Sequence, residues 1–238
     1  MRTLHTRRPW LIARLVVAVM LCLGAAAATL EAHGVSGLDA LFLQGITGPA
    51  IGPLMYLGAK HMVTGYDHLA FLAGVIFFLY KPRDILLYVT LFTIGHSITL
   101  LGGVLGGVRA NPYIIDAVIG LSVVYKALEN LGVFPLVLGF QPDTRLAVFV
   151  FGLFHGFGLA TKLQAFALPA NGLLVNIVSF NVGVELGQFI ALTSVFALLN
   201  AWRATPGFLR HAFVTNAALM TGGLLLAAYQ LSAYVLES

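Results

Sequence analysis

The sequence predicts an all-α protein, a polytopic bundle of about six transmembrane helices behind an N-terminal signal peptide. Two features of the composition support this fold class: 59% of the 238 residues are hydrophobic, and only 9% are charged. A soluble domain carries about 25% charged residues. The chain also contains several apolar runs of roughly 20 residues, the length that a helix needs to cross a bilayer. We therefore expect a lipid bilayer around the chain, and the formal charge of +4 is no argument for nucleic-acid binding.

The first 32 residues have the parts of a secretory signal peptide. Four arginines within residues 2–14 precede the apolar stretch LVVAVMLCLGAAAA, and cleavage is expected after Ala32. An uncleaved first transmembrane helix is the alternative. Cys22 is the only cysteine, so cleavage would exclude disulfides and thiolate metal sites. Cleavage would also make His33 the first residue, which is either a copper-chelating terminus or an ordinary residue beside a cleavage site.

Residues 33–60 are expected to form a periplasmic or interfacial lead-in, and residues 61–238 a transmembrane helical bundle. The lead-in is apolar over residues 37–58 but interrupted by Gly and Pro, and a seventh span is the alternative there. Turn signals such as KPRD, RANP and PANG separate the later apolar runs. The expected spans cover residues 62–80, 85–107, 113–131, 145–165, 173–199 and 213–234.

The predicted location is a bacterial inner membrane, crossed several times, with the mature N-terminus outside. The export signal places the N-terminus there, and the basic residues of the loops agree through a modest positive-inside bias. The predicted inner loops hold Lys81, Arg83, Arg145, Arg203 and Arg210, whereas the outer ones hold Lys60, Arg109 and Lys162.

Ionisable side chains within the predicted spans point to a site, because each costs about 3 kcal/mol or more at the membrane centre. His96, His155 and Glu185 lie near the middle of the second, fourth and fifth spans, and Asp67 and His68 in the outer part of the first. Imidazole and carboxylate are suitable ligands for Ni²⁺, Co²⁺, Cu²⁺ or Zn²⁺. The pattern predicts an ion or metal site inside the bundle, although a single intramembrane histidine can equally serve as an interhelical hydrogen-bond donor.

The head of the first span, HMVTGYDH, adds His61 to this set. His61 and His68 are seven residues apart, which separates them by about 10 Å along one continuous helix. Two successive sites, or a bend at Gly65, therefore fit the spacing better than one tight chelate. Asp67 is also a candidate for fixing the tautomer of a histidine.

Glycines flank two of the ionisable residues. One Gly-xxx-Gly pair, residues 152–156, brackets His155, and a second, residues 183–187, brackets Glu185. Small residues at this spacing let helix backbones approach closely, so we expect His155 and Glu185 to be brought toward each other. Ordinary membrane packing is the alternative.

These motifs resemble a known family. HMVTGYDH matches the H-x5-D-H signature of the HupE/UreJ family, membrane proteins associated with nickel supply to hydrogenase and urease. The stretches FTIGHSITL, LSVVYKALENL, FGLFHGFGLA and FNVGVELGQ look like blocks of the family's second branch, in the same order. The resemblance implies a six-helix metal permease or metal-handling protein with a cleaved signal, in which an ion first meets His61, Asp67 and His68.

One block departs from the pattern of the family's nickel permeases. Those proteins carry a stretch resembling FHGxAHGxE, with two histidines and a glutamate close together. This chain has FHGFGLA, which keeps only His155, and takes its glutamate from the next span. The resemblance therefore leaves cobalt, copper or another divalent ion open beside nickel.

We expect an inner-membrane permease for a divalent transition metal, nickel or cobalt with copper as a further candidate, and not an enzyme. The expected metal ligands, which form a path through the bundle, are His61, Asp67, His68, His96, His155 and Glu185. No organic cofactor is expected, and no Walker A motif of an ATPase is found. One alternative is a non-transporting metal-handling or assembly factor with a periplasmic metalloenzyme as partner. A metal-dependent intramembrane enzyme is a weaker one, because H-E-x-x-H is absent.

Overall fold

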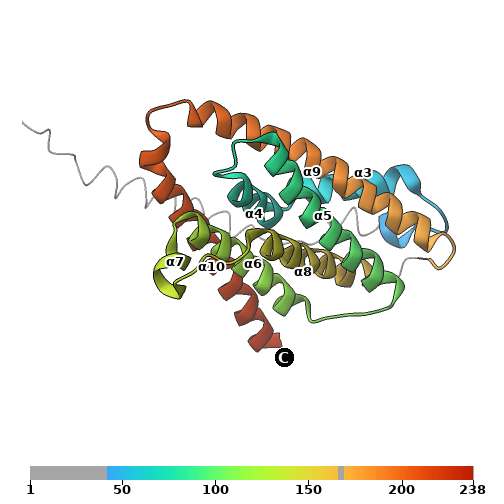
Figure 1. Cartoon of the computed structure of the whole chain (residues 1–238). Helices are drawn as coiled ribbons and strands as arrows, with labels where there is room; N and C mark the ends of the chain where they lie inside the picture. Colours follow the sequence, from blue (N-terminus) through green and yellow to red (C-terminus); the bar gives the residue numbers. More distant parts are fainter. Residues whose placement is uncertain (1–41, 166–168, 238) are drawn as a thin grey trace, which may run out of the picture. The chain divides into compact units, whose positions relative to one another are not determined.

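The computed structural model describes residues 42–165 and 169–237, and every regular element in these ranges is a helix. The described helices belong to one compact unit (Figure 1). The signal peptide and His33 lie outside the described residues. The helix bounds are α3 Ile51–Thr64, α4 Tyr66–Ile76, α5 Pro82–Leu105, α6 Pro112–Asn130, α7 Val133–Leu138, α8 Thr144–Gln164, α9 Leu173–Arg203 and α10 Phe208–Glu237.

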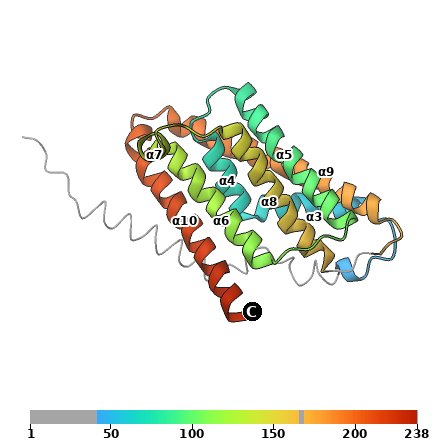
Figure 2. The ribbon, with the colours of Figure 1, turned by 60° about the horizontal axis from the view of Figure 1, so that its bottom comes forward.

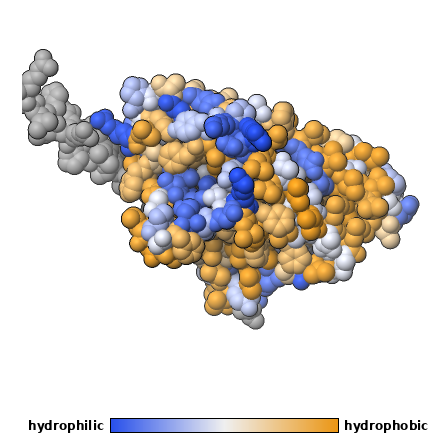
Figure 3. Space-filling view, viewed as in Figure 1, coloured by the Kyte–Doolittle hydropathy of each residue, from blue (hydrophilic) through white to orange (hydrophobic). Residues whose placement is uncertain are grey.

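Four of the described helices are long and apolar enough to cross a membrane: α5, α8, α9 and α10. They coincide with the second, fourth, fifth and sixth expected spans. α6 coincides with the third expected span. It is not one of these four helices because its 19 residues include three charged side chains, Asp116, Lys126 and Glu129. Apolar side chains cover much of the face shown in Figure 3. The chain is therefore a multi-pass membrane protein.

The first expected span, residues 62–80, is not a single helix. α3 ends at Thr64 and α4 begins at Tyr66, and the backbone of Gly65 between them is extended, with φ −73° and ψ 95°. α3 also begins at Ile51, within the expected lead-in, and packs along α9. The bundle thus contains a helix broken into two shorter ones.

Glycines let three pairs of helices approach closely: α3 with α9, α5 with α8, and α6 with α10 (Figure 2). A methyl group placed on Gly152 would overlap the backbone of α5, and one on Gly183 would overlap the backbone of α3. The expectation that the Gly-xxx-Gly pairs join the fourth and fifth spans is therefore wrong. Residues 152–156 pack α8 against α5, and residues 183–187 pack α9 against α3.

The short helix α4 lies at the centre of the bundle, packed against α3, α5, α6, α9 and α10. Its carboxyl end is held by two neighbours. Asn130 of α6 donates from Nδ2 to the carbonyl oxygen of Gly74 at 2.9 Å. Arg203 of α9 donates to the carbonyl oxygens of Ile76 and Phe77. These bonds fix the position of the helix that carries Asp67 and His68.

Candidate metal site

Three histidine rings, each from a different helix, lie close to the ring of His68 on α4. The ring centroid of His68 lies 5.2 Å from that of His61 on α3, 6.2 Å from that of His96 on α5, and 4.8 Å from that of His155 on α8. His68, His96 and His155 are buried, and His61 is half-buried. The break at Gly65 brings His61 and His68 together, which a continuous helix would not do. Of the two alternatives for this stretch, two successive sites or a bend at Gly65, the structure has the bend, and His61 and His68 lie in one cluster with His96 and His155.

Hydrogen bonds fix the tautomers of two rings. His68 Nδ1 lies 2.8 Å from Asp67 Oδ1, and His155 Nδ1 lies 2.8 Å from the carbonyl oxygen of Phe151. Carboxylate and carbonyl oxygens only accept, so each Nδ1 carries the hydrogen. In a neutral ring, Nε2 then holds the lone pair with which imidazole binds a metal. The sequence suggested this role for Asp67 but gave no sign of the Phe151 carbonyl.

Asp67 is a buried carboxylate at the N-terminal end of α4. Only 4% of it is exposed, and its Oδ1 also accepts the backbone N–H of His68 at 2.7 Å. It lies in the first turn of α4, where the helix dipole and the unpaired backbone N–H groups favour a negative charge. The residue is therefore well placed to orient His68.

Aromatic rings line the cluster. The centroid of Phe92 lies 6.5, 6.1 and 5.1 Å from the centroids of His68, His96 and His155. Nε2 of His96 is buried in this surrounding and has no hydrogen-bond partner among the described residues. Buried polar atoms in native proteins normally have a partner. A ligand bound at this nitrogen would therefore give it the partner that it lacks.

Each of the three ring distances from His68 is compatible with two imidazoles on one transition-metal ion. With metal–nitrogen bonds of about 2.1 Å, two imidazoles on one ion place their ring centroids roughly 4.5 to 6.4 Å apart, for ligand angles of about 90° to 180°. The three distances from His68 fall in this range. Among the described residues, however, no three His, Cys, Asp or Glu side chains are already arranged to hold an ion. Binding would therefore require the rings to turn.

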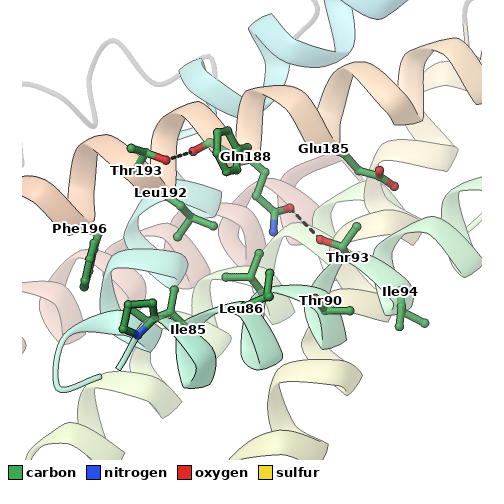
Figure 4. Close-up of a pocket in the computed structure, with 13 residues that line it drawn as sticks. Ile85, Leu86, Thr90, Thr93, Ile94, Glu185, Gln188, Leu192, Thr193 and Phe196 are labelled. Atoms are coloured by element: carbon green, nitrogen blue, oxygen red, sulfur yellow. Dashed lines mark hydrogen bonds between the residues drawn. The ribbon is translucent and has the colours of Figure 1, made fainter. Parts of the chain in front are cut away.

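Glu185 occupies a different place. It is exposed and lines a groove between α5 and α9, where its Oε1 accepts from Asn181 Nδ2 at 3.2 Å (Figure 4). Its position follows from helix geometry. Glu185 is two residues from both Gly183 and Gly187, hence about 200° around the helix from each, on the face opposite to the one packed on α3.

A comparison with protein families places these residues in context. The family model described as HupE / UreJ protein matches residues 38–238, which include the whole cluster. The chain belongs to the HupE/UreJ family. This family is linked to nickel and cobalt uptake, and its members are generally transporters rather than enzymes. No curated protein and no solved structure matches the chain.

The family match confirms the resemblance noted from the motifs. The stretch HMVTGYDH, which resembles the HupE/UreJ signature, contributes three members of the site: His61, Asp67 and His68. The structure adds the physical reason for its glycine, because Gly65 is the residue at which the helix breaks.

Proposed function

We propose that this HupE/UreJ protein is a permease for a divalent transition metal, with nickel or cobalt as the first candidates and copper as a further one. The ion binds His61, His68, His96 and His155, and Asp67 orients His68. The observation that carries this proposal is the convergence of three buried histidines and one half-buried histidine from four helices.

The donor set supports a transition metal over a hard cation. Neutral imidazole suits nickel, cobalt, copper and zinc, whereas magnesium and calcium prefer oxygen ligands. The hydrogen bonds to Asp67 and to the Phe151 carbonyl leave Nε2 as the metal-binding atom of two rings. Because protons compete with the metal for these nitrogens, binding weakens as the pH falls through the range in which imidazole titrates.

The broken helix favours a transporter over a non-transporting metal-handling factor. Secondary transporters commonly bind their substrates near the membrane midplane, where discontinuous helices meet. Irregular backbone such as that at Gly65 is tolerated at membrane depth when protein buries it or it lines a cavity. Two short helices joined at the ion site can change their mutual angle more easily than one continuous helix.

Metal accumulation in cells tests the proposal. We would express the protein in a bacterial strain without its own high-affinity nickel and cobalt uptake and measure both metals by elemental analysis. His68→Ala and His155→Ala should reduce uptake at least tenfold at equal protein level in the membrane. His211→Ala is the matched control, because His211 is exposed on α10 and lies outside the cluster.

Unchanged uptake in both cluster variants would contradict the proposal. If the purified protein binds metal stoichiometrically but moves none into vesicles, it is a metal-handling factor rather than a permease.

A further inference from the structure

A groove of about 580 Å³ runs between α5 and α9 on the side of α9 that carries Glu185. On α5 its lining extends from Pro82, the first residue of the helix, to Ile94, and on α9 from Phe196 back to Glu185. Twelve residues of helix span about 18 Å, and the hydrocarbon core of a bilayer is about 30 Å thick. The groove therefore reaches from one end of α5 to about the middle of the membrane.

The character of the lining changes along the groove. Most of the wall is apolar, but the inner end carries Thr93, Gln188 and Glu185 (Figure 4). Thr93 Oγ1 donates to Gln188 Oε1 at 3.2 Å, so the amide of Gln188 reaches across the groove from α9 to α5. Gln188 is only 2% exposed, and its Nε2 has no hydrogen-bond partner among the described residues.

Water in the groove would give both side chains a hydrogen-bond partner. The Nε2 of Gln188 needs an acceptor, and the Glu185 carboxylate, one turn earlier on the same helix, can accept more than the one hydrogen bond from Asn181. At about 30 Å³ for each molecule, the groove of about 580 Å³ has room for roughly twenty water molecules.

We infer that the groove is a water-filled half-channel and that Glu185, at its inner end, is a proton-binding site separate from the histidine cluster. The step is the transfer of one proton from hydronium in the groove to the carboxylate, which gives a carboxylic acid and water. This inference rests on the proposed transport function, for which it supplies the coupling ion.

A polar contact connects the proton site to the metal site. Asn181, which donates to Glu185, also exchanges hydrogen bonds of 3.1 and 3.0 Å with Ser97. Ser97 is the neighbour of His96 on α5. An ionised Glu185 attracts a divalent ion at the cluster and a protonated one does not, so proton and metal oppose each other's binding.

Among the described residues, Glu185 is the titratable group that lines the groove. The α5 residues of its wall carry none, and on the lining face of α9 the other side chains are amide, hydroxyl or apolar. The other charged or histidine side chains on α3, α4 and α5, which pack against α9, lie outside the lining: Arg83, Asp84 and His96 of α5, Lys60 and His61 of α3, and Asp67 and His68 of α4. Arg210 and His211, near the start of α10, are exposed and also outside it.

The test compares two modes of cobalt flux in liposomes that contain the purified full chain. Counterflow exchanges metal for metal and needs no proton movement, whereas net uptake is driven by an imposed pH gradient. The wild type should perform both. Glu185→Gln should lose at least tenfold in gradient-driven uptake and keep counterflow within twofold. Thr193→Ala, which alters the same groove away from its polar end, is the matched control.

Each outcome is decisive. Equal gradient-driven uptake in Glu185→Gln and wild type overturns the proton site. Loss of both modes in a variant that still binds cobalt also overturns it, because Glu185 would then belong to the metal path. Absence of counterflow in the wild type overturns the transport function instead.

A second measurement uses the wild-type protein and does not depend on the folding of a variant. Dicyclohexylcarbodiimide modifies protonated carboxylic acids in apolar surroundings. Peptide mass spectrometry should find the adduct on Glu185, with less of it as the pH rises and as cobalt is added. No adduct at any pH from about 5 to 8 would overturn the inference.

Discussion

Replacing Asp67 by asparagine tests how the histidine cluster is prepared for metal. The substitution keeps the size of the side chain and one carbonyl oxygen but removes the negative charge. In the native protein, Asp67 Oδ1 accepts from the His68 backbone N–H at 2.7 Å and from His68 Nδ1 at 2.8 Å. The carbonyl oxygen of the asparagine side chain can still accept both hydrogen bonds, although neither is then assisted by charge.

The magnitude follows from which of the two bonds changes when metal binds. The bond from the backbone N–H is the same with and without metal. Weakening it by the substitution therefore does not change the metal affinity. The bond from Nδ1 strengthens when the metal withdraws electron density from the ring of His68. Charge-assisted hydrogen bonds are about twice as strong as neutral ones. Removing such a partner of a metal-binding histidine typically weakens metal affinity by about 10- to 100-fold, or roughly 1.4 to 2.8 kcal/mol.

Titration calorimetry of the purified protein in detergent, with cobalt or nickel, measures this effect. Asp116→Asn is the control, because Asp116 is also buried, at 5% exposed, but pairs with Lys162 at 2.8 Å instead of with a histidine. Its metal Kd should stay within twofold of wild type. If folded Asp67→Asn also binds metal within twofold of wild type, the proposed role of Asp67 is refuted.

Three further predictions concern packing and metal binding. Gly156→Ala places a methyl group against the backbone of α5 and should lower the free energy of unfolding by about 1 to 3 kcal/mol; Gly102→Ala, with nothing within 4 Å of the new methyl, should not lower the thermal midpoint. Gly65→Ala places its methyl group 2.9 Å from the carbonyl oxygen of His61 and 3.1 Å from His68 Nδ1, so the metal Kd should rise about tenfold, and an unchanged Kd would speak against the role of the break. Free cobalt or nickel at 100 times its Kd should stabilise the fold by about 2.7 kcal/mol in a thermal scan, and a chelator should reverse the shift; no shift would mean that the native state binds no metal.

Much of the fold could be predicted from the chain because apolar runs and their turn signals set helix bounds directly. The helices α5, α6, α8, α9 and α10 each overlap an expected span almost fully. The break in the first span was harder to place. Gly65 was its only sign, and glycine is common in unbroken transmembrane helices. The sequence therefore raised a bend at Gly65 without deciding for it.

The site was predicted less well because its members depend on which helix faces meet. His96 and His155 were predicted to lie near the middle of their spans, and the structure places both rings next to the ring of His68. Glu185 was expected beside His155 because a Gly-xxx-Gly pair brackets it. The central residue of such a pair lies about 200° from both glycines, on the other side of the helix. The glycines packed on α3, and Glu185 was therefore turned toward the groove.

X-ray absorption spectroscopy of the purified protein loaded with nickel or cobalt tests the central claim most directly. We predict one ion per chain, bound by nitrogen at about 2.0 to 2.1 Å with the multiple scattering of at least three imidazoles. His68→Ala should lose the ion or at least one imidazole from this shell. A shell of oxygen ligands without imidazole scattering, or a spectrum that His68→Ala leaves unchanged, would contradict the account.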